Sequence, residues 1–374
     1  MPIDFLCGEV HFLDHLHPIW AALPAKDRGV LALTRSVSGG DAPGRLARHA
    51  RACGYEGCVA FPNTSNRQDA VVWLRTRPGP LVVASVGDAR TADKTGRPVV
   101  FCEHGAGQSY SSQHASYAGG QGGRRNVRLF LCPNEQAAER NRRAYPGVPA
   151  VVIGCPKLDA WHREPPPPRR EPPVVALSFH WPCEVCPETL WAFPHYRKGL
   201  GTVARDPRWQ LIGHGHPRAL SALRGHYATL GVEVVEQFAE VVARADCYVC
   251  DNSSTMFEFA SLGRPVVVLN APWYRREVEH GLRFWEAAGV GVQCSEPEAL
   301  PEAIATALQD APERRRAREA AVALAYAYTD GRAAQRAAKA IRETLCPSPS
   351  RSTRVTSSTS LKRRRGSPAS AAAK

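Results

Sequence analysis

The stretch from Asp251 to Ser254 has the residue types that bind a phosphate. Asp251, Asn252, Ser253 and Ser254 follow an apolar run, Cys247 to Cys250, and precede residues at helical spacing from Thr255 to Leu262. A helix amino terminus presents unpaired N–H groups and partial positive charge to an anion. Two serine hydroxyls would add further donors. This turn therefore predicts a binding site for a nucleotide diphosphate.

Two histidines stand where a parallel sheet places its chemistry, at the carboxyl tips of predicted strands. His104 follows the run Val99 to Cys102, and His216 follows the run Trp209 to Gly213. A neutral imidazole suits proton transfer near pH 7. We expect His104 to deprotonate an acceptor hydroxyl and His216 to donate to the donor's phosphate. The alternatives are a loop hydrogen bond for His104 and accidental exposure for His216.

Other polar residues are expected around these two histidines. His11 and His15 are four residues apart after the first predicted strand, and His11 is expected to line a cleft. The alternative is a solvated histidine at a helix start. Glycines after His104 free the backbone to form a mobile loop over the cleft. The predicted cleft residues are His11, Gly105, Gly107 and Gln108.

The turn and its flanks carry a family resemblance. Residues 251–266, D-N-S-S-T-M-F-E-F-A-S-L-G-R-P-V, resemble the signature D-Y-S-S-x-x-F-D-F-A-x-L-x-[KR]-P-[IV] of teichoic-acid CDP-glycerol glycerophosphotransferases. Asn252 replaces an aromatic residue and Glu258 replaces an aspartate. His104-Gly105, His216-Pro217 and the segment 154–159, G-C-P-K-L-D, are similar to further motifs of this family.

The resemblance implies a GT-B-like fold and a transferase activity. The family's histidine at the His104 position is regarded as the catalytic base. Glu258 is similar to the glutamate of nucleotide-sugar GT-B enzymes that commonly binds the donor ribose, and Arg264 would lie near the nucleoside. In proteins of this fold the last helix commonly crosses back to the first domain.

Apolar strands alternate with helical segments along the chain, which predicts an α/β fold of two Rossmann-like doubly wound domains facing a central cleft. Prolines at 165–168 and 172–173 predict a stiff connector. The expected division is an acceptor-side domain at 1–163, a linker at 164–173 and a donor-binding domain with closing helices at 174–346. Residues 347–374 are expected to be a disordered basic tail.

No metal or other cofactor is predicted. The twelve cysteines are expected to be free thiols, because the chain lacks the features of a secreted disulfide-rich protein. Cys247 and Cys250 lie three apart on a predicted strand, so they point to opposite faces and cannot bind one ion. Cys183 and Cys186 have workable zinc spacing but no second pair. No DxD-type metal site is evident.

The formal charge of +13 is concentrated at the end of the chain, because residues 351–374 contribute +7. This tail is a candidate contact for anionic lipid or nucleic acid. No apolar run has the length of a membrane span and no signal peptide is evident. We therefore expect a cytoplasmic protein, with a peripheral place at the membrane surface left open.

These features together predict a transferase that moves a glycosyl or polyol-phosphate group from a nucleotide-activated donor to an acceptor hydroxyl. The acceptor could be a polymer, a glycan, a protein or a modified base, and the sequence does not define the oligomeric state. A nucleotide-sugar epimerase of the same fold is the first alternative. It would need catalytic acids in the cleft, of which Glu103 is the clear candidate. A nucleic-acid-binding protein is the second.

Overall fold

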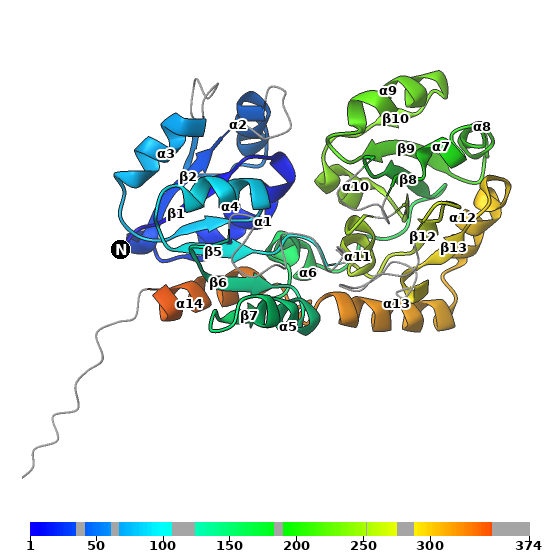
Figure 1. The fold of residues 1–374 in the computed structure, drawn as a ribbon. Coiled ribbons are helices and arrows are strands. Elements are labelled where there is room, and N and C mark those ends of the chain that lie inside the picture. The colour runs from blue at the N-terminus through cyan, green and yellow to red at the C-terminus, as the bar shows by residue number, and fades with distance from the viewer. Residues whose placement is uncertain are drawn as a thin grey trace, which may run out of the picture.

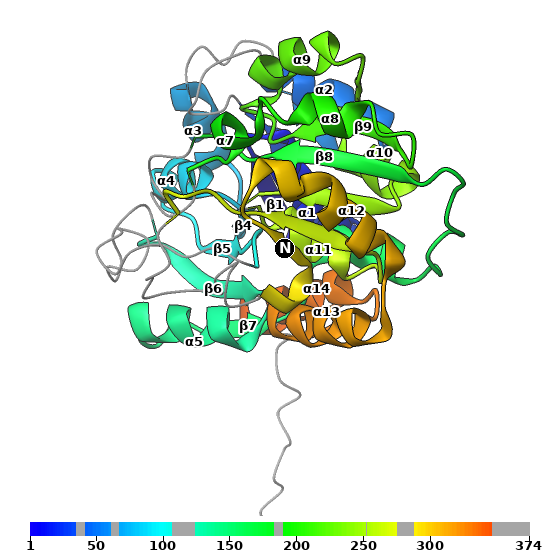
Figure 2. The same ribbon diagram turned by 90° about the vertical axis from the view of Figure 1, so that its right-hand side faces the viewer.

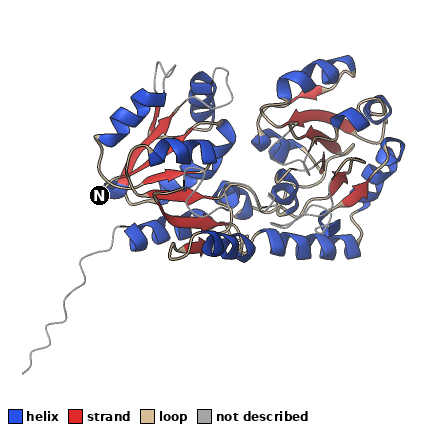
Figure 3. Cartoon of the chain, in the orientation of Figure 1, coloured by secondary structure: helices blue, strands red, loops and turns tan. Residues whose placement is uncertain are grey.

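Two parallel β-sheets, each enclosed by helices, form two lobes that lie side by side (Figure 1). The computed structural model describes residues 1–34, 42–60, 67–106, 124–182, 190–251, 253–274 and 288–345. Helices cover both faces of each sheet (Figure 3). This layering is what a doubly wound α/β fold requires, because parallel strands are buried on both faces.

The first lobe is built on a seven-stranded sheet of order β3-β2-β1-β4-β5-β6-β7. Its strands are apolar apart from Asp4, Arg28 and Arg128, and β1, β4 and β5 are buried along their whole length. The strands are β1 (Ile3–Cys7), β2 (Arg28–Leu33), β3 (Cys58–Ala60), β4 (Leu81–Val83), β5 (Val99–Cys102), β6 (Val127–Cys132) and β7 (Ala150–Val152). The helices among them are α1 (Val10–Ala22), α2 (Ala42–Ala52), α3 (Arg67–Arg75), α4 (Val86–Asp93) and α5 (Glu135–Ala144), and η3 (Pro156–Leu158) and α6 (Asp159–His162) follow.

The second lobe is built on a six-stranded sheet of order β10-β9-β8-β11-β12-β13. Every recorded strand pairing in both sheets is parallel. The strands are β8 (Val174–Phe179), β9 (Gln210–Gly215), β10 (Glu233–Val234), β11 (Cys247–Cys250), β12 (Val266–Leu269) and β13 (Val292–Cys294). The helices are α7 (Phe193–Tyr196), α8 (Leu200–Ala204), α9 (Leu220–Thr229), α10 (Phe238–Arg244), α11 (Thr255–Ala260), α12 (Leu300–Gln309) and α13 (Pro312–Ala325).

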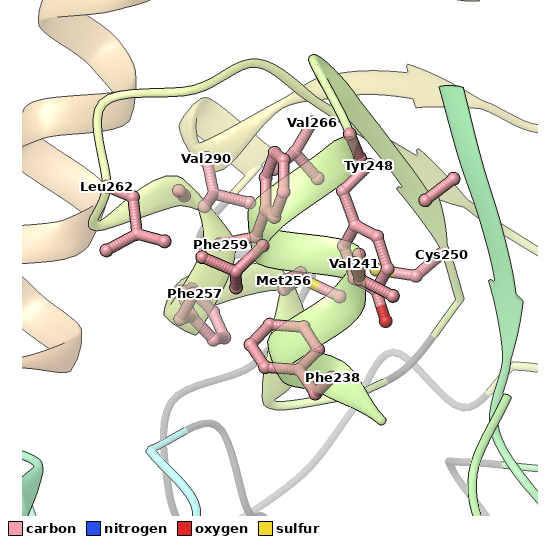
Figure 4. Close-up of a cluster of buried hydrophobic side chains, with 14 of the residues drawn as sticks. Phe238, Val241, Tyr248, Cys250, Met256, Phe257, Phe259, Leu262, Val266 and Val290 are labelled. Carbon is pink, nitrogen blue, oxygen red and sulfur yellow. The ribbon is translucent and has the colours of Figure 1, made fainter. Parts of the chain in front are cut away.

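A cluster of apolar side chains holds α10 and α11 against the second sheet (Figure 4). Met256, Phe257 and Phe259 of α11 are fully buried in it, together with Tyr248 of β11. The cluster fixes the direction of α11 and so the position of the turn that precedes it. Every such side chain is worth about 1.5–3 kcal/mol of burial free energy.

The two cysteines of β11 confirm the prediction from strand periodicity. Cys250 belongs to the cluster with α10 and α11, whereas Cys247 belongs to the cluster on the opposite face of the sheet. Successive side chains of a strand alternate between faces, so residues three apart diverge. This pair does not bind one metal ion.

The last helix, α14 (Ala333–Leu345), returns to the first lobe, as the family resemblance implied. Its Ala337, Ala338 and Ile341 are buried with side chains of β1 and α1. In both views α5, α13 and α14 lie along one side of the molecule (Figures 1 and 2). Among the described segments, no helix is long and apolar enough to cross a bilayer.

The closing helices expected before residue 346 are α13 and α14, with Gly331 at φ +70° between them. Strand β13 was not expected at all. Its pairing with β12, rather than a local pattern, makes it a strand. The predicted disordered tail, residues 347–374, lies outside the described residues.

Candidate active site

The strand order of each lobe has one point at which it reverses. In a doubly wound sheet, ligands bind at the carboxyl ends of the strands where the strand order reverses. In the first lobe this point lies between β1 and β4, and in the second between β8 and β11. His11 lies just after β1, and His180 directly follows β8. The site residues of both lobes therefore gather at these strand ends.

A row of imidazole rings runs from the strand ends of one lobe to those of the other. His11 of the first lobe and His216 of the second have ring centroids 5.3 Å apart. On one side of this pair His104 lies 6.2 Å from His11. On the other side His180 lies 5.1 Å from His216. The structure thus brings His11, His104 and His216, all predicted from sequence, into one site.

The hydrogen bond of His104 fixes which of its nitrogens is basic. Its Nδ1 donates to the carbonyl oxygen of Ala84 over 2.7 Å. A carbonyl only accepts, so Nδ1 carries the proton and Nε2 carries the lone pair. Burial lowers the pKa of His104 below its ordinary value of 6.5. The ring is therefore neutral at pH 7, with its lone pair on Nε2.

His216 has the opposite tautomer. Its Nδ1 accepts a hydrogen bond of 3.2 Å from the backbone N–H of Arg218, so the proton of the neutral ring sits on Nε2. Burial holds the pKa of His216 well below 6.5. Arg218 itself stacks over Trp181 and pairs with Glu9 of the first lobe. His216 is thus a hydrogen-bond donor held beside a cation.

His11 lies between these two rings and is also neutral. Burial lowers its pKa to about 3. Its Nδ1 is buried without a hydrogen-bond partner in the described part of the chain, although Oε2 of Glu9 lies 3.7 Å away. A buried imidazole nitrogen without a partner is costly unless something else completes it. The position between His104 and His216 suits contact with a bound substrate.

The predicted phosphate-binding turn is organised mainly by its own contacts. The hydroxyl oxygen of Ser253 accepts from the backbone N–H and the hydroxyl of Thr255, at 3.3 and 2.8 Å. The N–H groups of Met256 and Phe257 donate to carbonyl oxygens within the turn. Ser254 is half-buried, and its hydroxyl does not cap α11. Asn252 lies outside the described residues.

Asp251 lies between the end of β11 and this turn, and its side chain is fully buried. Its two oxygens accept backbone N–H groups of His180 at 2.6 Å and of Ala192 at 2.9 Å. Burial raises the pKa of Asp251 to about 7. The carboxyl group therefore ties the segment after β8 to the end of β11. In this structure it positions His180 rather than facing a ligand.

Glu258 and Arg264 were predicted to lie near the nucleoside, but their side chains have partners inside the protein. Glu258, 2% exposed, accepts from Nζ of Lys157 at 2.6 Å, and Lys157 belongs to η3 of the first lobe. Arg264 donates to the carbonyl oxygens of Val242 and Ala245 at 2.6 and 2.8 Å. Both side chains stabilise the packing around α11.

The segment 154–159 joins the lobes through several of its residues. Besides the Lys157 pair, Asp159 accepts the backbone N–H groups of Ala333 and Ala334 at the start of α14, at 2.9 and 2.7 Å. Gly154 has φ +87°, and a Cβ on it would stand 3.0 Å from the carbonyl oxygen of Tyr328. This motif therefore holds α11 and α14 in place and does not itself belong to the row of imidazole rings.

Glu103, the candidate acid of the epimerase alternative, is paired. Its oxygens accept from Nη2 of Arg140 at 2.9 Å and from Nδ2 of Asn141 at 2.7 Å. Although burial acts to raise its pKa, the two arginines Arg140 and Arg124 more than offset it, and the pKa of Glu103 is lowered. It is therefore a buried anion at neutral pH and not a proton donor.

Some predicted residues cannot be placed, and others were missed. Gly105 is buried beside His104, whereas Gly107, Gln108, Cys183 and Cys186 lie outside the described residues. His180 and Lys157 were not predicted to be part of the site. For His180 a signal existed, because it directly follows an apolar strand. For Lys157 the only signal was its place in the family motif.

The second lobe matches a known protein family. Residues 205–343 match the family model described as CDP-Glycerol:Poly(glycerophosphate) glycerophosphotransferase. These residues include β9 with His216, the turn at Ser253 and α11. The match confirms the resemblance drawn from residues 251–266. A search of curated proteins gave no match to this sequence.

Solved structures share the fold at low sequence identity. A UDP-N-acetylglucosamine 2-epimerase from Neisseria meningitidis, bound to UDP-GlcNAc, is 16% identical with a TM-score of 0.61, covering 92% of this chain and 99% of that chain. The wall teichoic acid polymerase TagF is 14% identical with a TM-score of 0.58, covering 91% and 88%. Both likenesses confirm the predicted GT-B-like arrangement of two Rossmann-like sheets.

Proposed function

We propose that this chain is a transferase of the CDP-glycerol glycerophosphotransferase-like family and that it moves a glycerol-phosphate-like group from a CDP-alcohol to an acceptor hydroxyl. The family match over residues 205–343 and the GT-B-like fold support this proposal. The observation that carries the proposal is the pair of complementary tautomers, with a basic Nε2 on His104 and a donating Nε2–H on His216. One imidazole can accept a proton while the other stabilises developing charge.

The proposed reaction begins with the acceptor hydroxyl beside His104. Nε2 of His104 takes the hydroxyl proton as the oxygen attacks the phosphorus that bears the glycerol. The bond from this phosphorus to the bridging oxygen breaks, and CMP leaves with the electron pair. The Nε2–H of His216 donates to a phosphate oxygen as negative charge builds up there, and Arg218 adds positive charge nearby. The products are the phosphodiester, CMP and a proton on His104.

The environment of Glu258 supports a CDP-alcohol over a nucleotide sugar. A glutamate that binds a donor ribose must offer a carboxylate oxygen to the ligand. Here Oε2 is bonded to Lys157, and Oε1 lies 4.0 Å from Nε2 of His15. The side chain is almost fully buried between the lobes. We therefore infer that it serves the lobe interface and that the family's own donor class applies.

The released nucleotide tests this assignment. With CDP-glycerol and a glycerol-phosphate oligomer as acceptor, we expect release of CMP and lengthening of the acceptor, both followed by chromatography. With UDP-GlcNAc we expect neither UDP release nor conversion to an epimer. Release of UDP together with transfer of the sugar to an acceptor would establish glycosyl transfer instead. Epimer formation without release would establish the epimerase alternative, which the pairing of Glu103 disfavours.

The pH dependence of the reaction follows from the histidine pKa values. Burial lowers the pKa of both His104 and His216, so each ring remains neutral at pH 6.5 and becomes protonated only at a lower pH. A base whose pKa is lowered loses activity only when the pH falls below that reduced value. We expect kcat/KM with CDP-glycerol to be unchanged from pH 7.5 to 6.5 and to fall at lower pH. A midpoint at or above 6.5 would contradict the burial argument.

A further inference from the structure

A second cluster of titratable side chains lies away from the imidazole row, where α1 and α2 meet. Asp14 of α1, His49 of α2 and Cys53 just after α2 each offer a ligand atom, and these atoms all lie within 4.8 Å of one another. His49 is buried, while Asp14 and Cys53 are half-buried. Carboxylate oxygen, imidazole nitrogen and thiolate sulfur are the three ligand types that proteins use for zinc.

The distances in this cluster agree with two ligands of one zinc ion. Bond lengths of about 2.3 Å for Zn–S and about 2.0 Å for Zn–N, at tetrahedral angles, separate sulfur and nitrogen by about 3.5 Å. Sγ of Cys53 lies 3.7 Å from Nε2 of His49. It also lies 3.9 Å from Nδ1 of the same ring. Cys53 lies one helical turn after His49, so the backbone itself brings the thiol and the imidazole together.

The third ligand needs a small adjustment. Nε2 of His49 and Oδ1 of Asp14 are 2.6 Å apart, the distance of a charge-assisted hydrogen bond. Two zinc ligands of this kind stand about 3.4 Å apart at tetrahedral angles. A cation would replace the shared proton, and the distance between the two atoms would increase by about 0.8 Å. Rotation of the half-buried aspartate side chain allows this increase.

Neighbouring groups complete the cluster in the way that metal sites are usually supported. The hydroxyl of Tyr55 donates to Oδ1 of Asp14 at 3.1 Å, which orients the carboxylate. The Tyr55 ring is in turn stacked on His17, with centroids 4.0 Å apart. From the second lobe, Oε1 of Gln237 lies 3.9 Å from Sγ of Cys53. This contact makes the amide oxygen a candidate for a fourth ligand.

We propose that Asp14, His49 and Cys53 form a zinc site, with Gln237 of the second lobe at the fourth position. Binding releases the thiol proton and the proton shared by His49 and Asp14, because both ligand atoms must be free to coordinate. The site is separate from the transferase residues. It lies on the side of the lobe interface where α2 faces α10, so the ion would link the two lobes there.

Cobalt titration tests the site directly, because tetrahedral cobalt bound to a thiolate has intense visible and near-ultraviolet absorption. The full chain, stripped with a chelator and dialysed, should take up one equivalent of Co²⁺ with these bands, and Zn²⁺ should displace it. Cys53→Ser should abolish the thiolate band, and His49→Gln should weaken binding by more than the about 10- to 100-fold that an outer partner costs. Tyr55→Phe should weaken it by about tenfold.

A matched cysteine variant controls for the other thiols. Cys58 of β3 is half-buried in the same lobe and is not part of the cluster, so Cys58→Ser should keep the full spectrum. Circular dichroism reports whether each variant folds. If Cys53→Ser does not fold, Tyr55→Phe and Gln237→Ala test the site in its place. Absence of stoichiometric cobalt binding by the unmodified chain overturns the site. An unchanged spectrum in folded Cys53→Ser or His49→Gln protein overturns it as well.

Discussion

Replacing His104 with asparagine is expected to reduce kcat for CMP release by about 10²- to 10⁴-fold, the usual contribution of a general base. Asparagine suits this test because its side-chain amide can still donate to the carbonyl oxygen of Ala84, as Nδ1 of His104 does. The loop after β5 should therefore keep its place. What the variant lacks is the basic nitrogen, so kcat falls while donor binding is retained.

A second histidine supplies the control. His226 of α9 packs against Phe193, outside the imidazole row, and His226→Asn should leave kcat within about twofold. Donor binding by His104→Asn, measured by the rise in melting temperature with CDP-glycerol, should equal that of the unmodified protein. A His104→Asn enzyme with undiminished kcat would remove His104 from the mechanism. Loss of both binding and activity would indicate a structural role instead.

The strands were predictable because a parallel strand buried on both faces is a continuous apolar run. Val99–Cys102 and Cys247–Cys250 have the bounds expected from the sequence. Strand β13 was not predictable in this way. It contains three residues with Gln293 exposed in the middle, and it is a strand because β12 offers an edge to pair with.

The division between α13 and α14 is fixed by contacts that are distant in sequence. The N–H of Ala327 donates to the carbonyl oxygen of Pro133 at 3.1 Å. The carboxylate of Asp159 then binds the first N–H groups of α14. Alanine and arginine favour the helices on either side, whereas Thr329, Asp330 and Gly331 between them have low helix propensity. A partner more than 170 residues away decides where the second helix begins.

The candidate site could be predicted in part for the same reason. His104 and His216 each follow an apolar strand, and the topology of a parallel sheet brings such tips to one edge. The partners of these histidines could not be predicted, because Ala84 and the Arg218 backbone determine the tautomers through precise distances. Glu258 is the clearest case. Its position on α11 was expected from the helical spacing, but its partner comes from the other lobe.

The pair of Lys157 and Glu258 should have the largest effect on stability. Both side chains are almost fully buried, and the nitrogen and oxygen are 2.6 Å apart. Burial lowers the pKa of Lys157, but the carboxylate of Glu258 more than offsets this, and the pKa stands above 10.5. Removing one member leaves the other as an uncompensated buried charge. We expect Lys157→Met to lower the free energy of unfolding by about 3–5 kcal/mol.

The double variant separates the cost of an unpaired charge from the value of the pair itself. Lys157→Met with Glu258→Leu should recover most of the stability that Lys157→Met loses, because an apolar pair of similar volume replaces a buried ion pair at little net cost. Urea denaturation measures the free energy of unfolding of the unmodified protein, of Lys157→Met and of the double variant. The exposed pair of Arg244 and Glu233, with atoms 2.7 Å apart, is the matched control, and Arg244→Met should cost less than about 1 kcal/mol. Equal losses at the buried and exposed sites would mean that Lys157 and Glu258 are solvated. The lobe contact between η3 and α11 would then depend on apolar packing alone.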